Sequence, residues 1–235
     1  MDATHTRERL LDTAERLFAA KGIRETSLRD ITAAAQTNLA AVNYHFGSKE
    51  GLLRAVLARR IDPLNQERLR LLDGYEAQAG DAPVPLEKIL HAFTAPSITL
   101  CYQSPDYMRL VGRILLDPDA ALREMFLSQF KVVAHRFLAA LSRALPTLPE
   151  AEIVWRVSFV IGAEIHTWIH SRNLEFFSAD ALTFADEQDV LERLIAFSVA
   201  GMRAPLPRRL KERYESTNGQ SRHRHRTNPR KESRK

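Results

Sequence analysis

The 235-residue chain lacks the features that mark secreted and membrane proteins. Cys101 is its only cysteine, so no intrachain disulfide can form. No run of about 18 apolar residues occurs, so no membrane span is expected. The first residues lack the apolar core of a signal peptide. Together these absences predict a cytoplasmic protein.

Signatures of catalysis are also missing. The sequence has no glycine-rich phosphate loop, no cluster of zinc ligands and no nucleophile elbow. Cys101 and His91 could be imagined as a nucleophile and its base, but they lie ten residues apart. One helix would separate them by about three turns, which prevents contact. We therefore expect neither an enzyme nor a bound metal or cofactor.

Charge is distributed unevenly along the chain. Residues 1–60 hold 10 Lys and Arg against 7 Asp and Glu, residues 61–204 hold 13 against 19, and residues 205–235 hold 11 against 3. A basic head, an acidic body and a basic tail predict that the head meets a polyanion, which the body would repel. These three ranges are also the expected domains.

Apolar residues recur with a helical period, and no convincing strand alternation occurs, so the fold class is expected to be all-α. The capping pair Asp117-Pro118 predicts one helix start, and Gly22 predicts an end. The tail, residues 211–235, has no apolar period and is expected to be disordered. It is either a solvated solubility tail or a cationic arm that attracts DNA. The expected helices cover residues 7–21, 28–35, 39–45, 49–60, 86–103, 106–116, 118–145, 149–171 and 186–204.

Residues 27–45 fit a helix-turn-helix, the second helix of which is very short. Ser27, Asn38 and Ser48 stand where N-caps are expected. The short helix would turn Ala40 and Asn43 outward, and an asparagine there can pair with adenine. Plain packing of two short helices is the alternative, but the segregated charge favours insertion into a DNA major groove.

Three segments resemble the DNA-binding domain of TetR-family transcriptional regulators: residues 11–22, 26–31 and 42–49. The resemblance implies a double-stranded DNA operator as partner. Residues 35–38 depart from the family, which more often has Ala-Gly-Val-Ser where this chain has Ala-Gln-Thr-Asn. By this resemblance Ala40 and Asn43 face bases, with part of Leu39 also outward. The residues expected near phosphates are Ser27, Arg29, Asn38, Tyr44, His45 and Lys49.

The same resemblance implies an N-terminal three-helix helix-turn-helix domain and a C-terminal helical domain for ligand binding and dimerisation. Residues 149–171 and 186–204 match the two helices through which family members form homodimers. A two-fold dimer implies a near-palindromic operator. Repression is the family default.

The body is similar to the PsrA-type, fatty-acid-responsive members of the family, through Met108-Arg109-Leu110, Trp155-Arg156-Val157 and residues 200–203. This implies a long-chain fatty acid or acyl-CoA as small-molecule effector. The side chains expected at the pocket are Met108, Arg109, Arg113, Met125, Phe126, Phe130, Trp155, Phe159 and His166.

Other readings of the body stay open. Arg109 and Arg113 could pair with acidic residues, and the Met and Phe side chains could be ordinary core. Glu164 and His166 are polar where a fatty-acid pocket needs apolar walls, which leaves open a more polar, aromatic or thioester ligand, or a different lipophilic one. Glu164 and His166 could also form a hydrogen-bonded pair inside the dimer. An architectural DNA-binding protein without ligand control is the remaining alternative.

Overall fold

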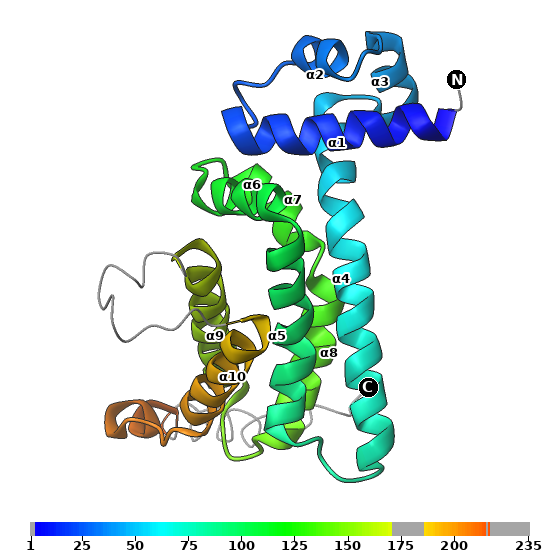
Figure 1. Ribbon diagram of the computed structural model, residues 1–235. Coiled ribbons are helices and arrows are strands. Elements are labelled where there is room, and N and C mark those ends of the chain that lie inside the picture. Colours follow the sequence, from blue (N-terminus) through cyan, green and yellow to red (C-terminus); the bar gives the residue numbers. More distant parts are fainter. Residues whose placement is uncertain (1–2, 171–185, 215, 217–235) are drawn as a thin grey trace, which may run out of the picture.

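The computed structural model describes residues 3–170, 186–214 and 216, with side chains described as far as residue 167 in the first of these ranges. Within these residues the regular structure is helical and no strand occurs, which confirms the all-α prediction. Figure 1 shows three helices at one end of a long fourth helix; some of the remaining helices pack along the rest of it, and the helices Glu150–His170 and Glu187–Arg203 lie beyond these. No helix in the described ranges has the length and apolar character needed to cross a membrane.

The head consists of α1 (Ala3–Lys21), α2 (Leu28–Ala34) and α3 (Leu39–Phe46), closed by the start of α4. Gly22 ends α1 with φ +102°, as expected, and its N–H donates to the Phe18 carbonyl at 3.0 Å. Ile31, Ala35 and Val42 are buried, so the inward faces of α2 and α3 are those that the apolar period indicates.

The fourth helix, α4 (Lys49–Ala79), is longer than expected. The predicted end near Arg60 was wrong because Pro63 does not stop the helix. Pro63 removes one backbone donor but lies on the exposed side, while Ile61 before it and Arg68 and Leu72 beyond it are buried. The expected domain boundary between residues 60 and 61 therefore falls inside a continuous helix.

The body contains α5 (Leu86–Gln103), α6 (Pro105–Leu116), α7 (Ala120–Ser128), α8 (Lys131–Ala144), α9 (Glu150–His170) and α10 (Glu187–Arg203). The single helix predicted for 118–145 was wrong, since α7 ends before Gln129 and α8 begins after Phe130. The Asn65 side chain donates to the Gln129 carbonyl at 2.9 Å, and Phe126 and Phe130 meet edge to face. The helix starts at the cap Asp119, two residues after the predicted Asp117.

The apolar core of the head continues into the body. One buried cluster unites the head with α6 and α7, for example Phe18 and Leu57 with Leu110 and Ile114. A second cluster joins α4 and α5 to α8, α9 and α10. Helix α6 is therefore packed as part of the head although it belongs to the body in sequence.

Two of the short segments that carry the PsrA-type resemblance, residues 155–157 and 200–203, contact each other in the structure. The Arg156 guanidinium is buried and donates to the carbonyls of Met202 at 2.8 Å and Ala204 at 2.6 Å. It also pairs with Glu152 at 2.9 Å. Arg156 thus satisfies the last carbonyls of α10 and fixes its end on α9.

The end of the chain was expected to lose its structure from residue 211. Residues 208–214 are helical, so the start of that expected tail was placed too early. Residues 217–235, which carry the Arg-His run at 222–226, lie outside the described residues.

Candidate functional site

Side-chain caps hold the short helices of the head in register. Ser27 accepts from the N–H of Asp30 at 3.1 Å, and the Asp30 carboxylate accepts from the Ser27 N–H at 2.9 Å, a complete capping box. The Ser27 hydrogen bonds lower the pKa of Asp30. The Asn38 side chain accepts from the N–H of Ala41 at 3.0 Å, and Ser48 caps α4 through Gly51 at 3.0 Å. All three predicted caps are confirmed.

The turn between α2 and α3 carries a strained residue. Gln36 has φ +49°, and it stands where the resembling family more often has glycine. Asn38, at the end of the turn, keeps an extended backbone. The Arg9 guanidinium donates to the Ala35 carbonyl and, at 2.7 Å, to that of Gln36. Arg9 of α1 thereby stabilises a turn that a glycine would adopt without strain.

The outer surface of the two short helices presents most of the residues expected at DNA. Tyr44 is 81% exposed, Leu39 is 45% exposed, and Ala40 and Asn43 are also exposed. Arg29 lies exposed on α2. One face of α3 thus offers a hydroxyl, an amide and small side chains that let the backbone approach a groove.

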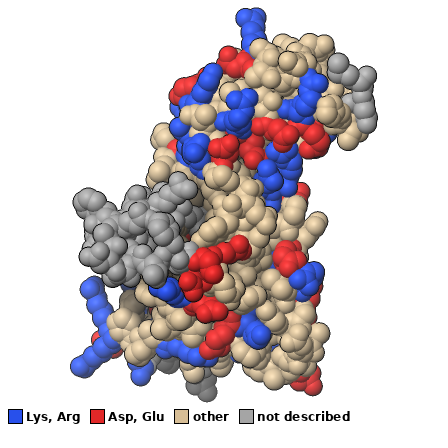
Figure 2. Space-filling view, in the orientation of Figure 1, with Lys and Arg blue, Asp and Glu red and all other residues tan. Residues whose placement is uncertain are grey.

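The remaining predicted phosphate contacts are engaged within the head. His45 is half-buried and meets the Tyr44 ring edge to face at 4.9 Å. Lys49 donates to the Arg24 carbonyl at 3.4 Å. The Ser27 hydroxyl donates to Asp30 at 2.7 Å, so a phosphate would have to compete with that carboxylate. Figure 2 shows Lys and Arg side chains over the head, intermixed with Asp and Glu where the head meets the body.

Arginine side chains tie α1 to α4 and to α6. Arg59 and Arg60 of α4 both pair with Glu15 of α1, at 2.8 and 3.1 Å. Arg113 of α6 donates to the carbonyls of Ala19 at 2.9 Å and Ala20 at 3.0 Å. These carbonyls belong to the last turn of α1, which has no intrahelical donors for them.

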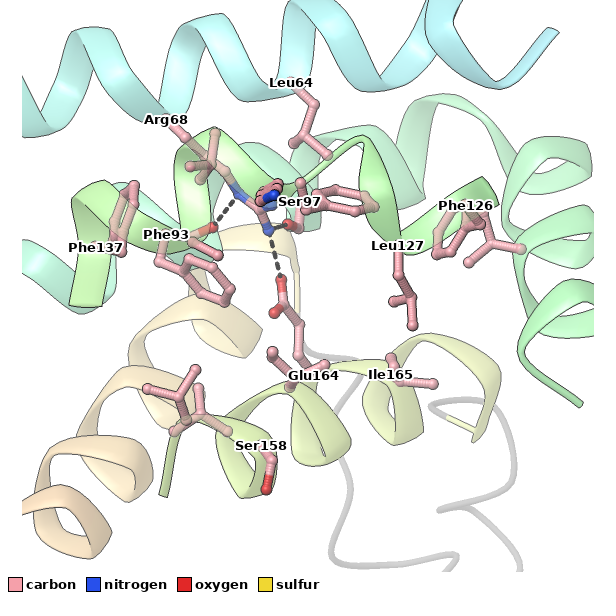
Figure 3. A pocket seen from close by; sticks show the side chains of 18 of the residues that line it. Leu64, Arg68, Phe93, Ser97, Phe126, Leu127, Phe137, Ser158, Glu164 and Ile165 are labelled. Carbon is pink, nitrogen blue, oxygen red and sulfur yellow. Dashed lines mark hydrogen bonds and ion pairs between the residues drawn. The ribbon is translucent and has the colours of Figure 1, made fainter. Parts of the chain in front are cut away.

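A cavity of about 940 Å³ lies in the body, lined by residues of α4 to α9. Its walls are almost entirely apolar. Figure 3 shows Leu64, Phe93, Phe126 and Phe137 around it. Cavities of this size hold drug-sized molecules.

A buried polar cluster interrupts these walls. Arg68 of α4 is 5% exposed and Glu164 of α9 is 1% exposed, and their charged groups lie 4.0 Å apart. Arg68 donates to the Phe93 carbonyl at 2.8 Å and to the Ser97 hydroxyl, and it stacks on the Phe93 ring at 4.3 Å. Burial raises the pKa of Glu164 to about 7, against the opposing effects of Arg68 and Ser97.

Three of the nine residues expected at the pocket line the cavity, and the other six do not. Met108, Phe126 and Phe130 line the cavity, whereas Met125 packs against the core that the head shares with α6 and α7. Arg109 pairs with Asp106 at 3.0 Å, and Arg113 holds α1 as described above. The other three, Trp155, Phe159 and His166, are exposed on α9.

Sequence reasoning missed Arg68 and Ser97 as cavity residues. A signal was present for Arg68, because it stands in the apolar stripe of Ile61, Leu64 and Leu72 at helical spacing. A charged residue at a buried position needs a partner. Glu164 was noticed as a polar residue on an apolar helix, but not as the partner of Arg68.

The pair once considered as catalytic does not assemble. Burial raises the pKa of the Cys101 thiol, so a thiolate is disfavoured. His91 contacts the Tyr75 hydroxyl at 3.1 Å instead. No group of His, Cys, Asp and Glu in the described ranges is arranged to hold a metal ion.

Comparison with known proteins places the chain in a family. The family model described as "Bacterial regulatory proteins, tetR family" matches residues 10–56. The model described as "Tetracyclin repressor-like, C-terminal domain" matches residues 91–201.

Individual relatives match mainly in part. The HTH-type transcriptional regulator SrpR of Pseudomonas putida is 40% identical over 63 residues, 27% of this chain and 30% of the relative. The HTH-type transcriptional repressor KstR2 of Mycolicibacterium smegmatis is 29% identical over 130 residues, 55% of this chain and 57% of the relative. The chain thus spans less than two thirds of the length of these curated relatives.

The fold extends over more of the chain than the sequence likeness. The crystal structure of a TetR-family transcriptional regulator from Bordetella parapertussis 12822 superposes with a TM-score of 0.61 at 19% identity. The superposition covers 86% of this chain and 97% of that one. With both family models matching in order and the all-helical fold in agreement, the chain belongs to the TetR family of bacterial regulatory proteins.

Proposed function

We propose that this protein is a dimeric transcriptional repressor that binds a near-palindromic operator and is released from it by a small, largely apolar ligand. Family membership and the printed name of KstR2, a repressor, support the sign of regulation. The observation that carries the proposal is the position of α6, since Tyr107 and Val111 both line the cavity and belong to the core of the head.

DNA reading is assigned to the exposed face of α3. Asn43 and Ala40 face the bases of the major groove, with Leu39 beside them. The phosphate contacts come from Arg29, Tyr44 and, after small rearrangements, from Ser27, Asn38, His45 and Lys49. Lys49 stands in the first turn of α4, where backbone N–H groups already favour an anion.

Dimerisation is assigned to the outer faces of α9 and α10, which lie side by side (Figure 1). Trp155 is 61% exposed, Phe159 is 66% exposed and Phe197 on α10 is 69% exposed. Large aromatic side chains exposed together on neighbouring helices are typical of protein interfaces. A second copy of the chain would cover them.

The effector is assigned to the cavity of the body. Its volume and its Leu, Met and Phe walls suit an acyl chain, so a long-chain fatty acid or acyl-CoA is the first class to test. Other aromatic or lipophilic molecules would use the same walls.

The test of the regulatory function is selection of bound DNA from random sequence by the full chain. A near-palindromic site bound at least about 10³-fold more tightly than random DNA is expected. Binding without sequence preference would indicate an architectural protein instead. Release of the selected DNA is then measured with palmitate, palmitoyl-CoA and neutral lipophiles, and release by none of them would contradict ligand control.

The test of the dimer is Phe159→Asp, measured by sedimentation velocity. The buried charge should convert the dimer to a monomer. Val132→Asp on α8, where the native side chain is 68% exposed, is the matched control and should leave the dimer intact. A wild-type chain that sediments as a monomer, or a Phe159→Asp dimer, would contradict the assignment.

A further inference from the structure

The inner wall of the cavity carries a charge pair with an unused acceptor. Glu164 is 1% exposed, and its Oε1 atom has no hydrogen-bond partner in the described structure. In Figure 3 the carboxylate of Glu164 points from α9 into the cavity, toward Arg68 on α4. The 4.0 Å separation between Arg68 and Glu164 is an ion pair but too long for a hydrogen bond.

One edge of the Arg68 guanidinium is already committed to the protein. Its Nε and Nη2 atoms donate to the Phe93 carbonyl and the Ser97 hydroxyl, so this edge of the fork is in use. The Phe93 ring covers one face. A ligand carboxylate would need two adjacent donors of the guanidinium for a bidentate contact, and it would lie next to the carboxylate of Glu164.

The balance of charge also bears on the ligand. With Glu164 ionised, the pair with Arg68 is neutral, so an anionic or cationic ligand head would leave a net charge in an apolar wall. The other charged lining residues are Arg123, Glu124 and Lys131. Each is half-buried or exposed, so water screens them more than the inner pair.

We propose that the effector of this site is an uncharged lipophile whose polar end donates a hydrogen bond, such as a phenol or a long-chain alcohol, and that Glu164 Oε1 accepts it. This rests on the proposed function, because it identifies the chemical class of that effector. The apolar walls receive the body of the molecule, and Glu164 selects its head. Either protonation state of Glu164 keeps an acceptor oxygen for the hydroxyl.

The experiment compares three probes of matched shape with the full chain at pH 8: 4-heptylphenol, 4-heptylanisole and 4-heptylbenzoate. Binding is measured by displacement of the neutral dye N-phenyl-1-naphthylamine, without DNA. The phenol should bind about 10-fold or more tightly than the anisole, which cannot donate, because a hydrogen bond to a charged acceptor is gained. The phenol should also bind at least about 10-fold more tightly than the benzoate.

A variant changes the preference. In Glu164→Gln, Arg68 loses its counter-charge, so the benzoate should bind more tightly. The ratio of phenol to benzoate affinity should then fall at least 10-fold. Glu124→Gln, the same substitution at an exposed position of the lining, should leave the ratio unchanged. If Glu164→Gln does not fold, the comparison of the three probes on the wild-type chain still decides.

The outcomes separate this inference from the proposed function. A benzoate that binds more tightly than the phenol, or an anisole equal to the phenol, would overturn the inference and leave an acid as effector. Displacement by none of the probes would overturn both the inference and the ligand-controlled function. Phenol preference that depends on Glu164 supports the inference, even if release of DNA needs a larger ligand.

Discussion

Raising the pH should destabilise this protein through Glu164. Its folded pKa is about 7 and its unfolded value about 4.5, because burial disfavours the carboxylate. The folded state therefore binds more protons than the unfolded state between these values. The resulting stabilisation is complete below about pH 4.5 and is lost as pH rises through 7. The two pKa values correspond to about 3 kcal/mol in total, of which about 2 kcal/mol disappears between pH 5.5 and 8.5.

Neighbouring groups do not mask this effect. Burial lowers the pKa of Arg68, but a guanidinium keeps its proton across this range. Burial raises the pKa values of Cys101 and Tyr107, so both remain neutral. The quantity to measure is a difference between two variants, in which ionisations elsewhere in the chain cancel. Urea unfolding, followed by circular dichroism at fixed protomer concentration, gives the free energy of unfolding for wild type and Glu164→Gln at each pH.

The wild-type curve should fall relative to the Glu164→Gln curve by about 2 kcal/mol from pH 5.5 to 8.5. Glu124→Gln should follow the wild type, since that carboxyl is exposed. Parallel curves for wild type and Glu164→Gln would refute the argument, because they would mean that Glu164 is solvated or fully paired in the folded protein.

Three other substitutions test separate parts of the molecule. Gln36→Gly should stabilise the fold by about 0.5–1 kcal/mol, since glycine adopts φ > 0 without steric strain and this gain outweighs its larger entropic loss. Gln66→Gly inside α4 should destabilise the fold, and a loss of stability in Gln36→Gly would contradict the strain at that position. Lys49→Ala should weaken binding to all DNA sequences and reduce the salt slope by about one, which Lys88→Ala in the body should not do. Arg156→Ala should destabilise by about 3 kcal/mol by leaving buried partners unpaired, while Arg208→Ala, in an equally spaced but 94% exposed pair with Glu212, should change little.

The sequence predicted the head well because its signals are local. Ser27, Asn38 and Ser48 each act on a backbone N–H three residues away, and Gly22 ends α1 through its own dihedral angles. Such features need no knowledge of the rest of the chain. The helix boundaries of α5 were also correct.

The errors fell where distant contacts decide. Pro63 reads as a break, but buried residues on both sides keep α4 continuous. No local signal separates α7 from α8. At this break the Asn65 side chain, on α4, donates a hydrogen bond to the Gln129 carbonyl. The pairing of Arg68 with Glu164 joins two helices that are far apart in sequence. Periodicity could show that each is a charged residue on an apolar helix face, but not that the two side chains meet.

The double membership of α6 has a consequence for how this protein would respond to ligands. Arg113 ties α6 to the last carbonyls of α1, so displacing α6 must either carry α1 along or leave the part-buried Ala19 carbonyl without its donor, at about 1–3 kcal/mol. Close-packed helices shift between discrete positions rather than continuously. A molecule that fits the cavity without moving α6 would occupy it tightly and still leave DNA binding unchanged. Occupancy and induction are then separable properties, and silent antagonists should exist among the smallest tight binders.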